Sequence, residues 1–358
     1  MAFITPFFKK NPEYCAWVGN GTQAITLLLQ EMGICGKKIA VPVAVCPSVI
    51  QAVLYSDNQP YYVEIDEDDL GISPKMLEQC IETVSAVIAV HSYGTLCSIK
   101  KIAEICQKHH KFLIEDCAQA LGAHINGQAV GTFGDASIFS FGTGKILDLG
   151  YGGAALSNDK SLVRRVKTCN SRLPELTEES KQTILGISTL HTSLYNSYYP
   201  NEIKRYAGIF KDLVLKGKSA YMFRSPDDLP ERVETSLESL DRNLVFRREK
   251  AMRFKNIFSH GGFRFHWPSD GGVFWRFNLF VESTRNMLLR ILLAEGFKVS
   301  SWHPRIDIFL DTEASIYKFP VAERIGAEIL NLWVNNEIDD FYVEQISNRI
   351  IEYRKSYV

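Results

Sequence analysis

Two hydrophobic patterns alternate along the first 160 residues of the chain. Short apolar runs, typical of buried strands, stand at 37–43, 60–65, 85–93, 111–116, 135–141 and 152–158. Longer stretches whose apolar residues recur at helical spacing stand at 22–33, 73–84 and 98–110. Strands that are apolar throughout are typical of parallel sheets covered on both faces. The alternation therefore predicts an α/β fold with a mostly parallel central sheet and flanking helices.

The pattern changes beyond residue 160. Residues 171–225 are polar and rich in tyrosine, and we expect helices with irregular joins there. Residues 229–258 carry charges between regularly spaced apolar positions and predict one long helix, with Pro230 in its first turn. The remainder predicts strands at 272–281 and 298–302 and helices at 284–297, 319–332 and 337–355. We therefore expect a large domain, 1–235, and a smaller C-terminal α+β domain, 236–358.

Composition narrows the classes of function. With 40 Lys and Arg against 41 Asp and Glu, the chain lacks the basic excess that binding to nucleic acid requires. Apolar runs stay below the roughly 18 residues of a membrane span. The N-terminal segment places its charges after its apolar residues, so we expect a cytoplasmic protein with neither signal peptide nor anchor. The eight cysteines form no C-x-x-C pair, which favours reduced thiols and gives no support for a metal site.

Lys145 stands among glycines and apolar residues in the segment FGDASIFSFGTGKILDLGYGG, residues 133–153. Two phosphate-binding motifs near it fail. A P-loop would need glycine at Phe139 and serine or threonine at Ile146. The segment GYGGAA at 150–155 precedes a strand-like run, whereas a dinucleotide-binding fingerprint follows a strand and opens a helix.

Two other segments suggest parts of a cofactor site. The glycine-flanked turn at 19–22 runs directly into a helical pattern, so backbone N–H groups and the helix dipole would converge on a point that suits a phosphate. The alternative is an ordinary helix start capped by Thr22. The run at 111–116 ends in Asp116, whose carboxylate can hold a cationic ring nitrogen, and Gln119 follows it. The alternative is Asp116 as the cap of a following helix.

Lys145 has two interpretations of its own. Desolvation among apolar neighbours such as Phe141 and Ile146 favours a neutral, nucleophilic amine that can capture an aldehyde, whereas lysines in surface loops are commoner. Ser140, shortly before it, offers a hydroxyl to a phosphate. A phosphate-binding turn, an acid for a ring nitrogen and an aldehyde-capturing lysine together describe a pyridoxal phosphate site.

These segments resemble the DegT/StrS-type sugar aminotransferases, a branch of the aspartate aminotransferase fold (fold type I). The similar segments run in order along nearly the whole chain: GNGTQA (19–24), AVHSYG (89–94), IEDCAQALGA (114–123), GTFGDASIFSFGTGK (131–145), GYGGAALSND (150–159) and FPVAERIGAEILNL (319–332). The resemblance implies a homodimer that uses pyridoxal 5'-phosphate. It also implies transfer of an amino group from an amino acid, with glutamate as the implied donor, to a nucleotide-linked keto sugar for polysaccharide or glycosylated-product biosynthesis.

Residue by residue, the resemblance implies that Lys145 binds the cofactor covalently and that Asp116 pairs with its pyridine nitrogen. These two would be the catalytic residues. Gln119 would contact the ring hydroxyl. The other implied cofactor-binding residues are Gly21, Thr22, Gln23 and Ser140 at the phosphate, Cys46 where many relatives place a stacking aromatic residue, and His91, for which no role follows.

Departures from the family pattern leave alternatives open. Besides Cys46, Met222 stands where relatives carry the asparagine of G-Y-N-x-R that reaches the partner subunit's phosphate, while Arg224 keeps the arginine. A non-catalytic regulatory subunit of the same fold is a second interpretation. A pyridoxal phosphate-dependent sugar dehydratase is a third, although those relatives have histidine in place of Lys145. The segment VSSWHPRID resembles a stretch near the sugar, so we expect His303 either near the acceptor or in a surface loop.

Overall fold

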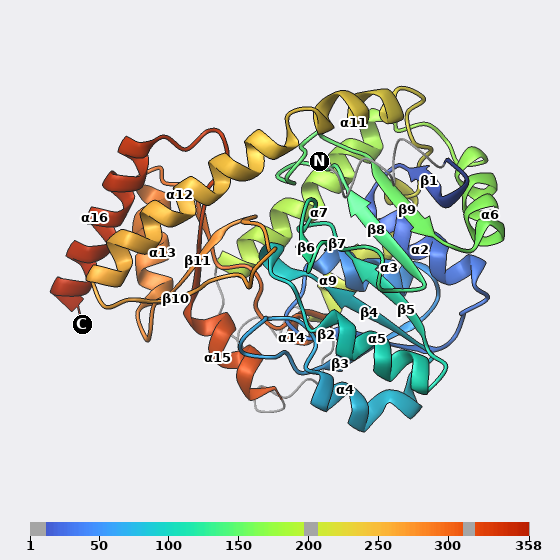
Figure 1. Ribbon diagram of the computed structural model, residues 1–358, viewed down its shortest axis with the longest axis horizontal. Coiled ribbons are helices and arrows are strands. Elements are labelled where there is room, and N and C mark those ends of the chain that lie inside the picture. The colour runs from blue at the N-terminus through green and yellow to red at the C-terminus, as the bar shows by residue number, and fades with distance from the viewer. Residues whose placement is uncertain (1–11, 197–206, 311–318, 358) are drawn as a thin grey trace.

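The computed structural model describes residues 12–196, 207–310 and 319–357, and two sheets organise it (Figure 1). The first sheet has the strand order β1-β9-β8-β5-β4-β2-β3, and the second has the order β10-β11-β13-β12. The N-terminal residues expected to carry no leader or anchor, 1–11, lie outside these ranges. No helix in the described ranges is long and apolar enough to cross a bilayer.

The first sheet is almost entirely parallel, as the sequence predicts. Strand β2 pairs in parallel with β3 and β4, β4 with β5, and β5 with β8, whereas β9 runs antiparallel to both β8 and β1. The short β1 and the β6/β7 hairpin were not predicted, because strands of two to four residues are too short to show a hydrophobic pattern. The bounds are β1 (Cys15–Val18), β2 (Lys38–Pro42), β3 (Gln59–Val63), β4 (Ala86–Val90), β5 (Phe112–Asp116), β6 (His124–Ile125), β7 (Gln128–Ala129), β8 (Ala136–Ser140) and β9 (Gly153–Ser157).

Helices cover both faces of this sheet, which explains why its strands are apolar throughout. In β4, Ile88 packs in one apolar cluster with residues of α2, α3 and α6, while Val87 and Ala89 pack in another with residues of α4 and α5. The helices of this part are α2 (Gly21–Glu31), α3 (Pro47–Tyr55), α4 (Pro74–Cys80), α5 (Ile99–Lys108), α6 (Lys160–Ser171), α7 (Glu178–Asn196), α9 (Ala207–Lys216) and α10 (Lys218–Tyr221). Single 3-10 turns are η1 (Pro12–Tyr14), η2 (Ile81–Thr83) and η3 (Ser92–Gly94).

The second sheet and the helices α12, α13 and α16 that pack on it lie on the left of Figure 1, whereas α11 and α14 pack in the apolar clusters of the first part. The division into 1–235 and 236–358 stays a prediction, and all of this sheet lies within the second part. Its strands are β10 (Arg264–His266), β11 (Phe277–Phe280), β12 (Val299–Ser300) and β13 (Ile329–Leu332). The helices are α11 (Leu229–Leu237), α12 (Leu240–His260), α13 (Arg285–Ala294), α14 (Asp307–Leu310), α15 (Pro320–Glu328) and α16 (Asp340–Tyr357).

Two predicted helices are wrong in part. The expected helix over 229–258 breaks between Leu237 and Leu240, because α11 packs its apolar side chains into one core while α12 packs Ala251 and Phe254 into the core of the second sheet. The expected helix over 319–332 ends at Glu328, and its last four residues form β13. All four are buried, and β13 pairs with strands on both sides, so tertiary pairing overrides local helix preference.

Candidate active site

A cavity opens at the carboxyl ends of β4, β5 and β8, beside the first residues of α2 and α3. Ligands of parallel sheets bind at this edge. The lining residues are Gly21, Thr22, Ile25, Cys46, Ser48, Val49, Val90, Asp116, Ala118, Gln119, Ile138, Ser140 and Lys145. A second cleft, lined by Lys111 and Asp135 among others, lies at the opposite ends of β5 and β8. Seven of the nine predicted cofactor residues thus meet in the first cavity; Gln23 and His91 do not line it.

The start of α2 forms one end of the cavity. Asn20, and not Thr22, caps this helix: its Oδ1 accepts the N–H of Gln23 at 2.8 Å. The first N–H groups of any helix have no acceptor within it, and the positive end of the helix dipole adds to them. A Cβ on Gly21 would stand 3.2 Å from the Cβ of Ser140, so glycine here keeps the space beside the serine hydroxyl open. These groups fit a phosphate.

Gln23 builds the turn before α2 and takes no place in the cavity. Its side chain is fully buried, with Oε1 accepting the N–H of Gly19 at 3.0 Å and Nε2 donating to Asn170 at 3.0 Å. Its backbone N–H is the one that Asn20 accepts. A phosphate contact by Gln23 stays a prediction, and these bonds do not favour it.

Asp116 ends β5 with its carboxylate in the cavity. One oxygen, Oδ1, accepts the N–H of Ala118 at 2.9 Å in a local turn, and no helix follows that it could cap. The second oxygen accepts no hydrogen bond among the described residues. Burial raises the pKa of this carboxyl, and the nearby Lys145 acts in the opposite direction. A cationic ring N–H placed against the second oxygen would satisfy it and favour the ionised form.

Lys145 lies in a turn that other residues hold rigidly. Its own N–H donates to the carbonyl of Gly142 at 3.2 Å, and the carboxylate of Asp148 accepts the N–H of Gly144 at 2.7 Å and that of Gly150 at 3.0 Å. The side chain of Lys145 is half-buried and lines the cavity. This placement favours an amine that meets a ligand over a lysine of a surface loop, and the covalent role of Lys145 stays a prediction.

Cys46 borders the same cavity at the start of α3. It is half-buried, and its thiol donates to the hydroxyl of Ser48 at 3.5 Å. None of the lining residues is aromatic. The lining therefore offers no aromatic ring that could stack on a cofactor. This agrees with the presence of a cysteine at position 46, where many relatives place an aromatic residue.

His303 lies beside the site. The sequence analysis left two placements open for this residue, near the acceptor or in a surface loop. His303 is 1% exposed and stacks on Tyr93 with ring centroids 5.4 Å apart, so its placement in a surface loop is wrong. The N–H of Tyr93 donates to Gln119 Oε1 at 2.6 Å, which fixes the orientation of that amide. The amide nitrogen of Gln119 must then donate to His303 Nε2, 3.3 Å away.

This arrangement keeps His303 neutral. Because Nε2 accepts a hydrogen bond, the proton of the neutral ring lies on Nδ1, which is buried and finds no partner among the described residues. Burial, with the charge of Lys145 as a smaller cause, lowers the pKa of His303 to about 3. His303 therefore supplies an uncharged hydrogen-bond donor near Lys145.

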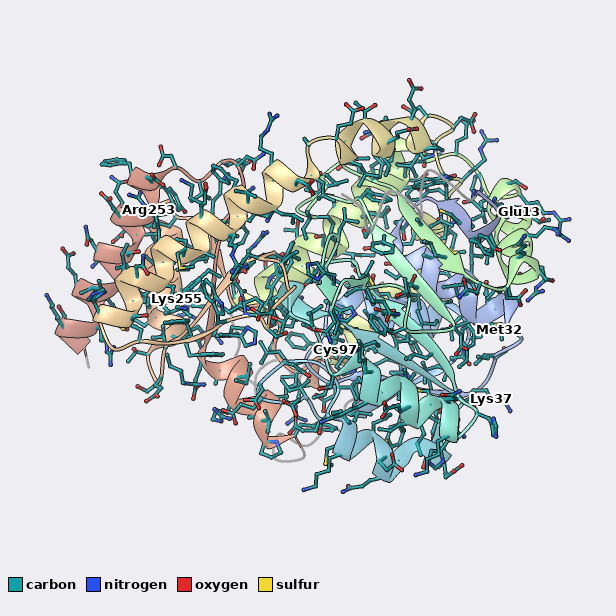
Figure 2. The ribbon with its side chains drawn as sticks, in the orientation of Figure 1. Glu13, Met32, Lys37, Cys97, Arg253 and Lys255 are labelled. Atoms are coloured by element: carbon teal, nitrogen blue, oxygen red, sulfur yellow. The ribbon has the colours of Figure 1, made fainter. Side chains whose placement is uncertain are left out.

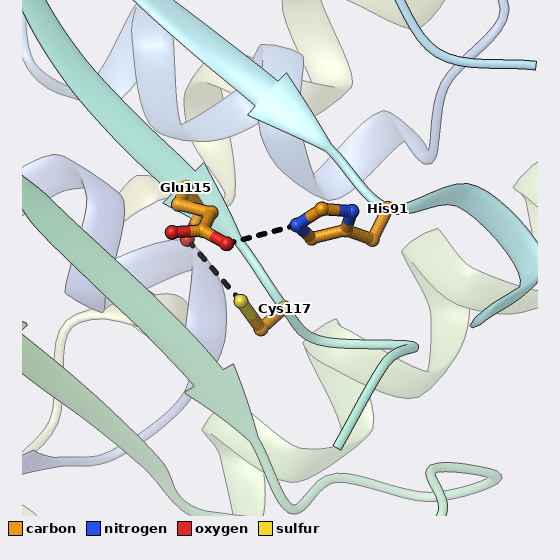
Figure 3. Close-up of side chains that lie close together, drawn as sticks. All are labelled: His91, Glu115 and Cys117. Carbon is orange, nitrogen blue, oxygen red and sulfur yellow. Dashed lines mark hydrogen bonds and ion pairs between the residues drawn. The ribbon is translucent and has the colours of Figure 1, made fainter. Parts of the chain in front are cut away.

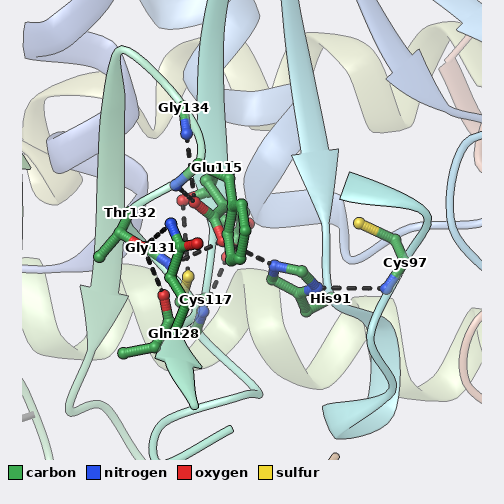
Figure 4. Close-up of polar contacts among 12 residues, drawn as sticks. His91, Cys97, Glu115, Cys117, Gln128, Gly131, Thr132 and Gly134 are labelled. Carbon is green, nitrogen blue, oxygen red and sulfur yellow. Dashed lines mark hydrogen bonds and ion pairs between the residues drawn. The ribbon is translucent and has the colours of Figure 1, made fainter. Parts of the chain in front are cut away.

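His91 and Glu115 form a buried structural contact behind the cavity (Figure 3). His91 Nε2 donates to Glu115 Oε1 at 3.0 Å, and its Nδ1 accepts the N–H of Cys97 at 3.2 Å. The Glu115 carboxylate also accepts the N–H groups of Gly131 at 2.6 Å, Phe133 at 2.9 Å and Gly134 at 3.3 Å (Figure 4). The two side chains therefore tie the loop before β8 to the ends of β4 and β5.

The thiol of Cys117 adds a third atom of a kind that metals bind. Its donor atom and those of His91 and Glu115 all lie within 4.8 Å of one another. The carboxylate already accepts four hydrogen bonds, however, and both ring nitrogens of His91 are used. Burial raises the pKa of Cys117 well above its usual range, so the thiol stays protonated. These contacts favour a structural role over metal binding.

A family model agrees with this site geometry. The model of the DegT/DnrJ/EryC1/StrS aminotransferase family matches residues 7–187. This chain belongs to that family. The matched segment holds Lys145, Asp116 and all other predicted cofactor residues, so the family assignment covers the candidate site and not only the fold.

Curated proteins match about half of the chain. GDP-perosamine synthase of Escherichia coli O157:H7 is 37% identical over 166 residues, which are 46% of each chain. dTDP-3-amino-3,6-dideoxy-alpha-D-galactopyranose transaminase of Aneurinibacillus thermoaerophilus is 38% identical over 183 residues, 46% of this chain and 50% of that one. The chain thus spans about half the length of the curated relatives it matches.

A solved structure shows the same fold over the whole chain. The aminotransferase TlmJ of Streptoalloteichus hindustanus superposes with a TM-score of 0.79 at 20% identity, covering 99% of this chain and 89% of that one. The putative sugar aminotransferase Spr1654 of Streptococcus pneumoniae gives the same TM-score at 16% identity. The predicted fold of the DegT/DnrJ/EryC1/StrS aminotransferases is therefore confirmed, including the part that follows residue 187.

Sequence reasoning expected His303 near the acceptor as one alternative, but it missed Trp275 and Arg276 of the second sheet. Trp275 Nε1 donates to the carbonyl of Gly144 at 2.7 Å, and its ring stacks near that of His303. Arg276 follows it and is buried. One signal was available: an arginine inside the apolar run VFWRFNLF is unusual unless a ligand or partner needs its charge.

Changing Glu115 to glutamine should destabilise the chain by about 2–4 kcal/mol, because one carboxylate oxygen becomes an NH2 group that faces N–H donors. Urea unfolding measures the loss. The matched control is Glu82→Gln, an exposed carboxylate paired with His109, which should leave the stability close to that of the wild type. Wild-type stability that rises with added zinc would contradict the structural role.

Changing His303 to glutamine should weaken the pH dependence of stability. In the unfolded chain this histidine takes up a proton near its ordinary pKa of about 6.5, whereas in the folded chain its pKa is about 3. Between these two pH values only the unfolded state binds the proton, so the folded state becomes less stable as the pH falls. Without this group, the free energy of unfolding should fall about 1.4 kcal/mol less per pH unit between about pH 4 and 6. His260→Gln, at an exposed position, is the control; equal slopes for both variants would refute the assignment.

Proposed function

We propose that the chain is a cytoplasmic, pyridoxal phosphate-dependent aminotransferase that moves an amino group from an amino acid, glutamate first among the candidates, to a nucleotide-linked keto sugar. One observation carries the proposal: Lys145, Asp116 and the start of α2 line a single cavity. An amine, a buried carboxylate and a phosphate-binding helix end are the groups that this cofactor needs from a protein.

Each group of the chain has a task in the proposed reaction. The first N–H groups of α2 and the Ser140 hydroxyl bind the phosphate, and Gly21 keeps room for it. Asp116 accepts the ring N–H, and the second N–H of the Gln119 amide is free to meet the ring oxygen. When bound, pyridoxal phosphate withdraws electrons from the carbon that carries the amino group. Nζ of Lys145 holds and moves the proton at that carbon.

The names of the relatives support the acceptor class. Two of them are named for sugars linked to GDP and dTDP. A third, from Acidithiobacillus ferrooxidans, is 38% identical over 196 residues and is named as a 3-aminotransferase of a UDP-linked sugar. The nucleotide and the carbon that receives the amine differ among these names, so the proposal extends to the class and not to one sugar.

The segment around Met222 bears on the phosphate contact across subunits. Asn20, the cap of α2, donates through Nδ2 to the carbonyl of Tyr221 at 2.8 Å, and a Cβ on Gly19 would collide with Phe223. This segment therefore packs on the phosphate-binding turn of its own chain. Since Met222 offers no amide, another residue must supply any contact across subunits. A non-catalytic subunit is the alternative that Cys46 and Met222 favour, whereas Lys145 argues against a dehydratase.

Lys145→Ala tests the proposal. The wild type, supplied with pyridoxal phosphate, should show the visible absorbance of lysine-bound cofactor, and glutamate should convert it to the amine form. The variant should show neither, because no other amine lines the cavity. Lys181→Ala, at an exposed lysine of α7, is the control and should behave as the wild type. A wild-type band that no amino acid changes would instead support the non-catalytic subunit.

A homodimer is part of the same proposal. Leu185 on α7 and Ile209 and Leu213 on α9 expose 59%, 62% and 42% of their surface, more apolar area than a free surface favours. The wild type should sediment as a dimer, and Ile209→Asp with Leu213→Asp should shift it towards the monomer. Val245→Asp, at an exposed position of α12, should leave the dimer intact. A wild-type monomer that stays fully active on dilution would contradict the dimer.

A further inference from the structure

Two arginines are buried side by side without a carboxylate. Arg247 on α12 is 3% exposed and Arg276, directly before β11, is 5% exposed. Neither forms an ion pair with a carboxylate among the described residues. Burial lowers the pKa of Arg247 to about 10, and burial together with the charge of Arg247 lowers that of Arg276 to about 9. The fold thus places two like charges in a poorly solvated position.

Arg247 uses its hydrogen bonds within the fold. Its Nε donates to Asn243 Oδ1 at 2.6 Å, and its Nη1 lies 3.3 Å from the carbonyl oxygens of both Phe274 and Trp275. These bonds join α12 to the segment that leads into β11. Arg247 therefore has a structural role that needs no ligand.

Arg276 is less well satisfied. Its Nη1 donates to the carbonyl of Trp275 at 2.8 Å, but its Nε is buried and has no hydrogen-bond partner. The guanidinium carbon lies 4.2 Å from the ring centroid of Trp275 and 3.9 Å from that of Trp333. Two indole faces offset part of the cost of burying this charge, but they accept no hydrogen bond from Nε.

The guanidinium borders the turn that carries Lys145. Its Nη2 lies 3.8 Å from the place where a Cβ on Gly144 would stand, and Trp275 donates to the carbonyl of the same glycine at 2.7 Å. The second sheet thus brings a fixed positive charge next to the amine-bearing turn of the first. The charge of Glu337 acts on Arg276 and that of Asp116 acts on Lys145, but neither carboxylate accepts a hydrogen bond from Arg276, whose Nε stays without an acceptor.

We infer that Arg276 forms a binding position for an oxyanion, a carboxylate or a phosphate group, beside Lys145. A buried charge is costly unless it is paired, and a guanidinium offers parallel N–H donors that match an oxyanion. Assigning the oxyanion to a substrate rests on the proposed function. The oxyanion would then be a carboxylate of the amino-acid donor or a phosphate of the nucleotide-linked acceptor. Both substrates react next to Lys145, so either group could reach Arg276.

The first experiment measures anion binding without any reaction. Thermal unfolding of the full chain, loaded with pyridoxal phosphate so that the phosphate-binding turn is filled, is followed with added glutarate and with added pyrophosphate. A ligand that binds only the folded state raises the melting temperature. The inference predicts a rise of a few degrees for one of the two anions in the wild type and no rise in Arg276→Met. Glutarate identifies the donor's carboxylate, and pyrophosphate identifies the nucleotide.

The matched control is Arg253→Met, an arginine on α12 with 42% of its side chain exposed (Figure 2). It should respond to anions as the wild type does. If Arg276→Met does not unfold cooperatively, Arg276→Lys replaces it: the charge remains but the paired N–H donors are lost, so the response should shrink.

The second experiment separates the two substrates by kinetics. Arg276→Met should raise KM about tenfold or more for the substrate that carries the oxyanion, and for that one only. Arg253→Met should leave both KM values unchanged.

Equal anion stabilisation in wild type and Arg276→Met would overturn the inference, as would a wild type that neither anion stabilises. The guanidinium would then merely pack between its two indoles. These outcomes differ from failure of the proposed function: anion stabilisation that depends on Arg276, in a chain that glutamate does not convert, would keep the oxyanion site and reject the aminotransferase.

Discussion

The site depends on two adjacent carboxylates at the end of one buried strand. Side chains of successive strand residues point to opposite faces, so Glu115 and Asp116 meet different surroundings although both are almost fully buried. Glu115 is satisfied by His91 and by three N–H groups of the loop before β8. Asp116 keeps one oxygen unused and faces the cavity. One carboxylate fixes the strand ends, and the other is left free to bind.

The second sheet completes the site from the other side of the cavity. The N–H of Trp275 donates to the carbonyl of Tyr93 at 3.1 Å, and the N–H of His303 donates to the Tyr93 hydroxyl at 2.5 Å. Asn331, buried in β13, bonds both the N–H and the carbonyl of Trp302 and so fixes the residue before His303. Neutral rings and a guanidinium therefore reach the amine-bearing turn on segments anchored by backbone bonds, as a preorganised binding site requires.

In the predicted roles, the chain keeps the family's charged groups and changes the groups around them. The resemblance matches Lys145 and Asp116 to the family's lysine and acid, whereas the cavity lining holds no aromatic ring and Met222 lacks an amide. Contacts that depend on charge or on a covalent bond have few substitutes among side chains. Stacking and neutral hydrogen bonds have more substitutes, so the groups that supply them can differ. The rings of Tyr93, Trp275 and His303 stack on one another beside the cavity rather than in its lining.

The sequence by itself determined the parallel sheet, the cavity's position and most of its lining, because apolar strand runs, a glycine before a helix and residues at strand ends are local signals. It did not determine β13 or the break between α11 and α12, where pairing with distant strands and packing into separate cores override helix preference. Nor could the sequence show that the side chain of Gln23 is hydrogen-bonded to the Gly19 N–H and to Asn170. Only the tertiary structure brought Arg276 and His303 to Lys145. Both residues are far from Lys145 in the sequence, so no local pattern of residues indicates the contact. Only the packing of the two sheets places them beside the turn that carries Lys145.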